Sequence, residues 1–352
     1  MIKITTGPKV VLWLLIIAAL LTGCTGRAPA TSWPELTVAE DVMYVASGAK
    51  VYALETETGN QKWEFPGEEK KGPFYAAPAV EAGLVFVGSN DGNLYALDAV
   101  TGNQRWVFET QKPIIAGPAV AGDTVYVASA DHKVYALEAA TGVGRWEFTT
   151  GNWVWATPLV ADDKVYVGSM DHKMYCLDAQ SGQKLWEFEA GGAIAAPPTL
   201  AGNLLYFGAF DSKVYALDAT SGAKRWEFQA GGWVWSRPLV VNDTVYVGSM
   251  DKKVYALDAA SGQKKWGFAT EGAVVAGPAF AEGLLYVASE DKQLYALDAA
   301  SGQKRWWFTA KTSIFTPPAL ADGMVCICSQ DGRVYALDAD NGNQRWVFPR
   351  TE

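Results

Sequence analysis

Short apolar and aromatic runs, separated by turn residues, fill most of the chain. In one representative stretch, residues 233–241, 244–248, 253–257 and 265–268 are rich in β-branched and aromatic side chains, as β-strands are. Asn-Asp, Ser-Met-Asp-Lys and Ala-Ser-Gly separate these runs and favour turns. Beyond the first 23 residues, no window of 10 residues keeps a 3.6-residue apolar period free of Gly, Pro or β-branched residues. The pattern predicts an all-β protein built from four-strand units.

The four-strand unit occurs eight times. A Trp marks each copy, with a spacing of 43 residues once and 40 residues six times, and a period of this size indicates a repeat architecture. The marker residues are Trp63, Trp106, Trp146, Trp186, Trp226, Trp266, Trp306 and Trp346. The repeat predicts an eight-bladed β-propeller of four-stranded antiparallel blades over residues 31–350. The alternative is an open solenoid, but its ends would need polar capping repeats, which these copies do not provide.

The first copy departs most from the others. Its hairpin Ser47–Lys50 is one residue short and lacks the Asp of the sister copies. We therefore expect the ring to close between the first and the eighth blade, and the sequence leaves open whether a terminal strand crosses that seam.

A motif around each Trp resembles a known family. Residues 96–106 are Ala-Leu-Asp-Ala-Val-Thr-Gly-Asn-Gln-Arg-Trp, which is similar to the tryptophan-docking motif of the pyrroloquinoline-quinone (PQQ) repeat family. The motif recurs with minor changes in all eight copies. The resemblance implies a quinoprotein-like propeller in which each Trp is sandwiched between blades, while Asp and Thr/Ser-Gly shape a turn. Glycine suits unusual turn angles and an indole provides a large apolar contact, so we expect all eight Trp to be structural.

The PQQ repeat family divides by function. Its alcohol dehydrogenases hold PQQ and calcium beneath a disulfide between adjacent cysteines; propellers of the barrel-assembly lipoprotein BamB type carry no cofactor and bind proteins; others are sensor modules. This chain has no adjacent Cys pair, and its 40-residue blades leave no long loops for an active site. We therefore expect a monomeric, non-catalytic scaffold without cofactor or metal, which binds a protein or peptide in outer-membrane protein assembly. A PQQ-dependent oxidoreductase and a small-ligand or glycan sensor are the alternatives.

Residues 1–23 have the pattern of a signal peptide. Lys3 and Lys9 precede the uncharged run Val10–Leu21, which is too short to span a bilayer. The segment Leu-Thr-Gly-Cys24 resembles the bacterial lipobox, which implies cleavage before Cys24 and acylation of this residue, with palmitate among the acyl chains. Residues 24–35 would then be a lipidated tether. The propeller would face outside the cytoplasm on a bacterial membrane, the outer one if the cell has one.

Charge and cysteine content narrow the possible partners and the means by which the fold is stabilised. Removing residues 1–23 leaves 27 basic and 38 acidic residues, a net charge of −11, whereas a nucleic-acid partner requires a basic face. The remaining cysteines, Cys176, Cys326 and Cys328, stand where sister copies carry Ala, Gly or Tyr. We therefore expect small core residues rather than disulfides.

Histidine and aspartate recur in hairpin turns. His132 and His172 are the only histidines, and other copies carry Lys or Ser in the same position, so we expect turn residues rather than metal ligands. Seven aspartates repeat at one hairpin position, where we expect their side chains to bond turn amides. They are Asp91, Asp131, Asp171, Asp211, Asp251, Asp291 and Asp331.

One variable position indicates a binding surface. Three residues before the leading Pro of each copy, aromatic residues alternate with aliphatic ones along the repeats. We call the following set the aromatic collar: Tyr75, Trp153, Trp155, Trp233, Trp235, Arg237 and Phe315. Alternate residues of an inner strand face the same side, and aromatics around an Arg are typical of a binding hot spot, so we predict that the collar binds the partner at one channel mouth. Packing of these aromatics between blades, or the opposite register with Val154, Val234 and Ile314 toward the channel, is the alternative.

Overall fold

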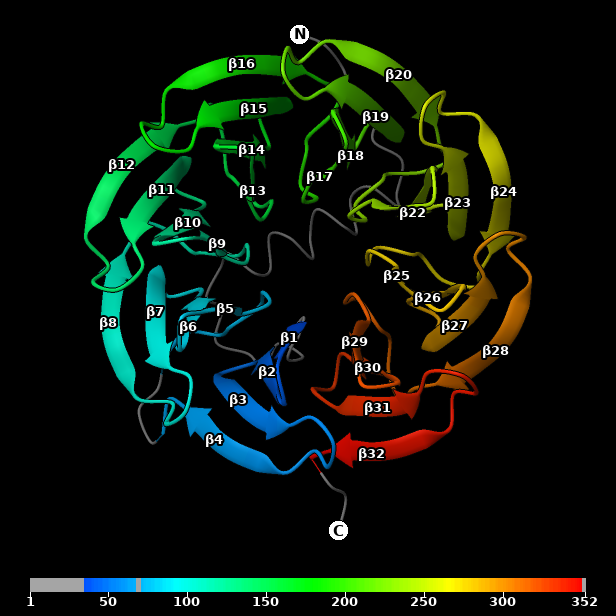
Figure 1. Ribbon diagram of the computed structural model, residues 1–352, viewed down its shortest axis with the longest axis horizontal. Coiled ribbons are helices and arrows are strands. Elements are labelled where there is room, and N and C mark those ends of the chain that lie inside the picture. Colours follow the sequence, from blue (N-terminus) through cyan, green and yellow to red (C-terminus); the bar gives the residue numbers. More distant parts are fainter. Residues whose placement is uncertain (1–34, 68–70, 350–352) are drawn as a thin grey trace, which may run out of the picture. The chain divides into compact units, whose positions relative to one another are not determined.

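The computed structural model describes residues 35–67 and 71–349, which form a ring of eight four-stranded sheets (Figure 1). This confirms the predicted all-β, eight-bladed propeller. The predicted signal peptide, Cys24 and nearly all of the predicted tether lie outside the described residues. Within the part that the structure describes, no helix has the length and hydropathy needed to span a membrane.

Each of the first four blades consists of four consecutive strands. Blade one contains β1 (Glu35–Ala39), β2 (Val42–Ser47), β3 (Lys50–Glu55) and β4 (Gln61–Phe65). Blade two contains β5 (Ala79–Glu81), β6 (Leu84–Gly88), β7 (Asn93–Asp98) and β8 (Gln104–Glu109). Blade three contains β9 (Ala119–Ala121), β10 (Thr124–Ala128), β11 (Lys133–Glu138) and β12 (Gly144–Thr149). Blade four contains β13 (Leu159–Ala161), β14 (Lys164–Gly168), β15 (Lys173–Asp178) and β16 (Lys184–Glu189).

The last four blades follow the same plan. Blade five contains β17 (Thr199–Ala201), β18 (Leu204–Gly208), β19 (Lys213–Asp218) and β20 (Lys224–Gln229). Blade six contains β21 (Leu239–Val241), β22 (Thr244–Ser249), β23 (Lys253–Asp258) and β24 (Lys264–Ala269). Blade seven contains β25 (Ala279–Ala281), β26 (Leu284–Ala288), β27 (Gln293–Asp298) and β28 (Lys304–Thr309). Blade eight contains β29 (Ala319–Ala321), β30 (Met324–Cys328), β31 (Val334–Asp338) and β32 (Gln344–Phe348).

The innermost strands are shorter than the sequence pattern predicts. Residues 233–241 were expected to form one strand, but β21 covers only the last three of them. The preceding segment bonds to hairpin turns instead: the Val234 amide donates to the Ala209 carbonyl of blade five at 3.2 Å, and the Trp233 carbonyl accepts from the Met250 amide at 2.9 Å. Pro238 has no amide hydrogen to offer a neighbouring strand. The segment is therefore a loop that leads into the inner strand.

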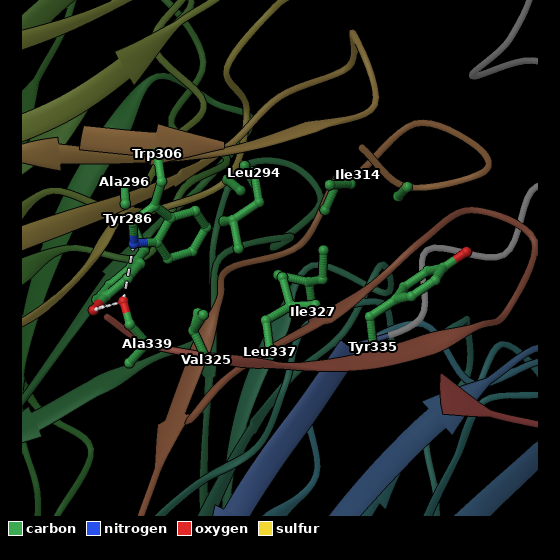
Figure 2. Close-up of a cluster of buried hydrophobic side chains, with 13 residues drawn as sticks. Tyr286, Leu294, Ala296, Trp306, Ile314, Val325, Ile327, Tyr335, Leu337 and Ala339 are labelled. Carbon is green, nitrogen blue, oxygen red and sulfur yellow. Dashed lines mark hydrogen bonds between the residues drawn. The ribbon is translucent and has the colours of Figure 1, made fainter. Parts of the chain in front are cut away.

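The repeated Trp joins each blade to the next, as the motif predicts. The indole Nε1 of Trp306 donates to the Ala339 carbonyl at 3.1 Å, and the Tyr286 hydroxyl donates to the same oxygen at 3.0 Å (Figure 2). Around this pair lies a buried cluster to which blades seven and eight both contribute, including Leu294 and Val325 (Figure 2). Every docking Trp donates an equivalent bond to the following blade, at 2.9–3.1 Å. The interface combines apolar burial with a satisfied indole N–H.

The Asp and Gly of the motif shape the turn against which the Trp packs. In blade two, the Asp98 carboxylate accepts from the Thr101 amide at 2.8 Å and from its hydroxyl at 2.9 Å. Gly102 follows with φ of +72°, and a Cβ at this position would lie 2.7 Å from the Trp63 ring. Glycine is required here both by the backbone angle and by the approach of the indole.

The ring closes without strand exchange, because each sheet contains only consecutive strands. Across the seam, Trp346 of blade eight donates its Nε1 hydrogen to the Thr56 carbonyl of blade one at 3.0 Å. Cys326 and Cys328 are buried in the apolar cluster that fills the seam. These two cysteines and Cys176 are free thiols in the core, as the repeat comparison predicts.

Candidate partner-binding face

The collar lies on the face formed by two kinds of loop. One kind joins the outer strand of a blade to the inner strand of the next, and the other is the hairpin turn between the two middle strands. The hydrogen bonds of Val234 and Trp233 described above tie one loop to two such turns, those of blades five and six. The inner strands that these loops enter surround the central channel (Figure 1). The face is therefore a ring of mutually supported loops rather than a set of strand ends.

The collar side chains and their sequence neighbours point in different directions. Val154, Val234 and Ile314 are fully buried in the clusters between blades. Trp153, Trp155, Trp233, Trp235, Tyr75 and Phe315 are each only half-buried. The structure thus places the aromatics outside the inter-blade core, in the register that leaves them accessible. Their role in binding stays a prediction.

On blade four, two collar residues stack on each other. The rings of Trp153 and Trp155 have centroids 5.6 Å apart and planes inclined by 20°. The Trp155 indole Nε1 is buried, and no hydrogen-bond acceptor reaches it among the described residues. A buried donor without an acceptor costs about 1–3 kcal/mol. The pair therefore combines a half-buried aromatic surface with one buried hydrogen-bond donor that lacks an acceptor.

On blades five and six, the aromatic cluster has a member that the sequence analysis did not identify. Phe210, in the middle hairpin turn of blade five, stacks on Trp233 with centroids 4.7 Å apart and planes inclined by 8°. It also meets Trp235 edge-on at 5.7 Å. Equivalent turns carry Asn, Ala, Met, Glu or Gln, so the aromatic departure was a visible signal. What the sequence could not show is that this turn lies under the loop of the next blade.

Arg237 provides the cationic group of the collar. Its side chain is exposed, and its Nε donates to the Thr199 hydroxyl of blade five at 3.3 Å. The protein around the guanidinium lowers its pKa by desolvation, although the side chain stays open to solvent. No carboxylate of the described chain pairs with it. An exposed, partly desolvated Arg beside aromatic rings is suited to a carbonyl or carboxylate acceptor.

A buried carboxyl group lies in the corresponding hairpin turn of blade seven. Burial raises the pKa of Glu290 to about 7, and its Oε1 has no hydrogen-bond partner among the described residues. Glu35, at the start of β1, also has its pKa raised to about 7 by burial, against the effect of a 2.7 Å bond from the Ala77 amide. In both carboxyl groups, burial disfavours the charged form and raises the pKa.

The hairpin aspartates and histidines have the structural roles that the sequence predicts. Asp171 accepts from the amides of Gly151 at 2.7 Å and Lys173 at 3.0 Å, and five of the other hairpin aspartates, Asp91, Asp131, Asp211, Asp251 and Asp291, also accept from backbone amides. Asp331 differs and accepts from the Ser329 hydroxyl. His132 and His172 adopt φ of +74° and +75° in their turns. The described residues hold no cluster of three or more His, Cys, Asp or Glu arranged for a metal ion.

The remaining collar aromatics, Tyr75 and Phe315, belong to other blades. Tyr75 lies on the loop into blade two and Phe315 on the loop into blade eight. The structure thus brings together Trp153 with Trp155, and Trp233 with Trp235 around Phe210.

Comparisons with known proteins agree with this architecture. The family model described as the β-propeller of the β-alanine-activating enzyme matches residues 154–351. The model of the outer membrane protein assembly factor BamB matches residues 25–116 and 108–199. A search of curated protein sequences gave no match.

Solved structures share the fold over nearly the whole propeller. BamB from Moraxella catarrhalis superposes with a TM-score of 0.75 at 21% identity, covering 88% of this chain and 96% of that one. The computationally designed Ika8 protein superposes with a TM-score of 0.78 at 18% identity, covering 88% and 97%. The first family model covers more than half of the sequence, and the second covers most of the remainder. The chain therefore belongs to the PQQ-like repeat β-propellers, the family that includes the β-propeller of the β-alanine-activating enzyme and the assembly factor BamB.

Proposed function

We propose that this protein is an extracytoplasmic scaffold that binds a protein or peptide segment on the collar face, in the assembly of outer-membrane proteins. The match to the model of the assembly factor BamB supports the class of function. The unsatisfied indole N–H of Trp155, presented beside the stacked ring of Trp153, supports the site. A shift of the Trp155 ring on binding would bring this buried donor to a backbone carbonyl of the bound polypeptide and remove its desolvation cost.

The two aromatic groups would act as anchors for apolar side chains of the partner. Trp residues contribute strongly to interfaces, since they bring a large rigid surface and a single donor. Arg237 would orient the partner through its free guanidinium N–H groups. We expect no catalytic residue and no cofactor in this activity.

Site-specific photo-crosslinking in membranes of the source cell tests the proposal. A photoreactive residue at Asn152, exposed beside Trp153, should capture one partner, which mass spectrometry would identify as a barrel-assembly component. The matched control is Val143, which is 62% exposed in a turn on the opposite face and should capture nothing specific. Trp155→Ala combined with Trp235→Ala should abolish capture at Asn152 while the melting curve stays cooperative. If the folded double variant still captures the partner, the collar is not the binding surface.

The proposed lipid anchor is tested separately. Cys24 lies outside the described residues, and the lipobox-like segment before it supports acylation at this position. Cells fed radiolabelled palmitate should label the wild-type chain and not Cys24→Ser, which should also leave the membrane fraction. Equal labelling of both chains would contradict the anchor.

The PQQ-dependent oxidoreductase makes a different prediction. Cys326 and Cys328 are both buried in the seam between blades eight and one, so neither fits the cysteine bridge that covers the quinone in such dehydrogenases. Incubation with PQQ and calcium should give no bound quinone absorbance and no dye reduction with alcohols. A stoichiometric quinone spectrum would favour the enzyme instead.

A further inference from the structure

The outer strands of the propeller carry a repeated charge arrangement. In blade five, Glu227 on β20 pairs with Lys213 and with Lys224, each at 2.6 Å. In blade four, Glu187 on β16 pairs with two lysines in the same way, again at 2.6 Å. Both lysines lower the pKa of the carboxylate through hydrogen bonds. On these blades, one glutamate therefore pairs with two rim lysines and lowers their combined charge from +2 to +1.

Blades six and seven lack this glutamate. Gly267 stands in its place on β24 and Trp307 on β28. Lys253 and Lys264 of blade six occupy the positions of the paired lysines of blade five, yet no carboxylate of the described chain lies within ion-pair distance of either. Both side chains are exposed. The replacement therefore leaves two uncompensated positive charges on the rim.

Packing does not require the replacement. A Cβ at Gly267 would meet nothing closer than the Val254 carbonyl at 3.6 Å, which is ordinary van der Waals contact. The residue is not among the glycines with positive φ. Since a side chain fits there and glycine weakens a strand, the loss of the glutamate has no structural cause that we can identify.

Trp307 adds an exposed aromatic ring to the same region. It is 55% exposed, whereas its neighbour Trp306, which docks on blade eight, is 8% exposed. The Lys304 ammonium lies 4.3 Å from the centre of the Trp307 ring. The two strands β24 and β28 are neighbours on the outer rim (Figure 1). Of their four basic residues, Lys265 pairs with Asp258 and Arg305 with Asp298, whereas Lys264 and Lys304 have no ion-pair partner among the described residues. We call Lys253, Lys264, Lys304 and Trp307 the rim patch.

We propose that the rim patch binds the anionic phospholipid headgroups of a membrane surface. The patch is cationic although the whole chain carries a formal charge of −9, so it supplies a local attraction against the general charge. Lysines near an anionic bilayer contribute about 1 kcal/mol each. A Trp ring settles at the headgroup level, and lysine stems reach along it to the phosphates.

The inference is independent of the proposed collar function. The collar lies on the loops that lead into the inner strands, whereas Lys264, Lys304 and Trp307 lie on the outermost strands β24 and β28, and Lys253 begins the adjacent strand β23. A partner on the collar and a membrane at the rim would therefore occupy different surfaces. Contact through the rim would place the channel axis along the membrane plane.

Co-sedimentation with vesicles tests the proposal. The full chain carrying Cys24→Ser, so that no acyl chain contributes, is mixed with phosphatidylcholine vesicles with and without phosphatidylglycerol. We expect binding only to vesicles that contain phosphatidylglycerol, with affinity that falls as salt rises. Gly267→Glu, which rebuilds the arrangement of blades four and five in blade six, combined with Trp307→Glu, which places a carboxylate beside Lys304 in blade seven, should lower the affinity by on the order of tenfold or more.

A matched variant controls for net charge. Val107→Glu makes the same change as Trp307→Glu at the equivalent position of blade two, where the side chain is 48% exposed. It should leave vesicle binding unchanged, and all variants should share the wild-type unfolding midpoint. The proposal would be overturned if the parent chain fails to bind phosphatidylglycerol vesicles. It would also be overturned if Trp307→Glu, tested as a single variant, and Val107→Glu lower the vesicle affinity equally. Binding to polyglutamate or to DNA without vesicle binding would likewise overturn it, in favour of an acidic polymer.

Discussion

Closure of the ring makes a quantitative prediction at Trp346. The Trp346 side chain is 8% exposed, and its Nε1 donates to the carbonyl of Thr56, which is 1% exposed. Trp346→Phe removes this donor and leaves the carbonyl buried without it, at a cost of about 1–3 kcal/mol. The smaller ring leaves space in the seam, which adds roughly 1 kcal/mol. We expect a total loss of about 2–4 kcal/mol in the free energy of opening the seam.

Trp226→Phe is the matched control. Trp226 is also 8% exposed and donates the same kind of bond, to Ala259 at 2.9 Å, but its two blades are joined by the chain. Both variants should lower the urea midpoint measured by circular dichroism. Only Trp346→Phe should open the seam locally, because there the non-covalent contacts alone join the blades.

Hydrogen exchange with peptide resolution separates these outcomes. The amides of Thr56 and Gly59, bonded to Asp41 and Glu55, should exchange about 30-fold faster or more in Trp346→Phe than in the wild type, since 2 kcal/mol corresponds to that factor. In Trp226→Phe they should stay protected. The prediction fails if Trp346→Phe keeps the amide protection and urea midpoint of the wild type while Trp226→Phe clearly lowers the midpoint. That result would show that blades one and eight do not pack against each other in solution.

Two further predictions concern the repeat turns and the carboxyl group of Glu290. In Gly262→Ala, the new Cβ lies 2.6 Å from the Trp226 ring at φ of +73°, whereas in Gly83→Ala, at φ of +77°, it meets nothing within 4 Å. Denaturant titration should show Gly262→Ala to be less stable than Gly83→Ala by about 1–3 kcal/mol. Equal losses of stability in the two variants would assign the cost to the backbone conformation alone. Burial raises the pKa of Glu290 from 4.5 to about 7, so the folded state holds a proton that the unfolded chain releases, and the Glu290 contribution to stability declines as pH rises from 4.5 to 7. Glu290→Gln should therefore stabilise the protein, relative to the wild type, by roughly 2 kcal/mol more at pH 8 than at pH 4, and an equal difference at both pH values in thermal melts would contradict this.

The fold was predictable because one sequence pattern repeats eight times. The docking Trp and the turn Gly keep the same roles in all eight blades, so their spacing predicts the number of blades. The error over residues 233–238 has a physical cause. Trp233, Val234 and Trp235 alternate between half-buried and fully buried positions as a strand would, but the backbone groups of Trp233 and Val234 bond to turns. A hydropathy pattern reports which way side chains face and does not report the hydrogen-bond partner of the backbone.

The candidate sites were only partly predictable. The collar aromatics stand out in the aligned copies, whereas Phe210 joins them only because a hairpin turn of one blade lies beside the loop of the next. The significance of Gly267 depends on knowing that the equivalent Glu227 holds two lysines. Both cases need contacts between segments that lie apart in sequence, and a single sequence does not supply these contacts.

A propeller made of similar copies contains its own controls, and this allows structure and function to be separated position by position. Where all copies agree and the contact is buried, as for Gly262 beneath Trp226, a change is unfavourable in every blade. Glutamate follows the docking Trp in four of the eight copies, and the space at Gly267 would admit it, so packing does not account for its absence there. Such a departure persists at no structural benefit, so its explanation belongs to whatever contacts that surface. The collar and the rim of blades six and seven are therefore the surfaces to test first.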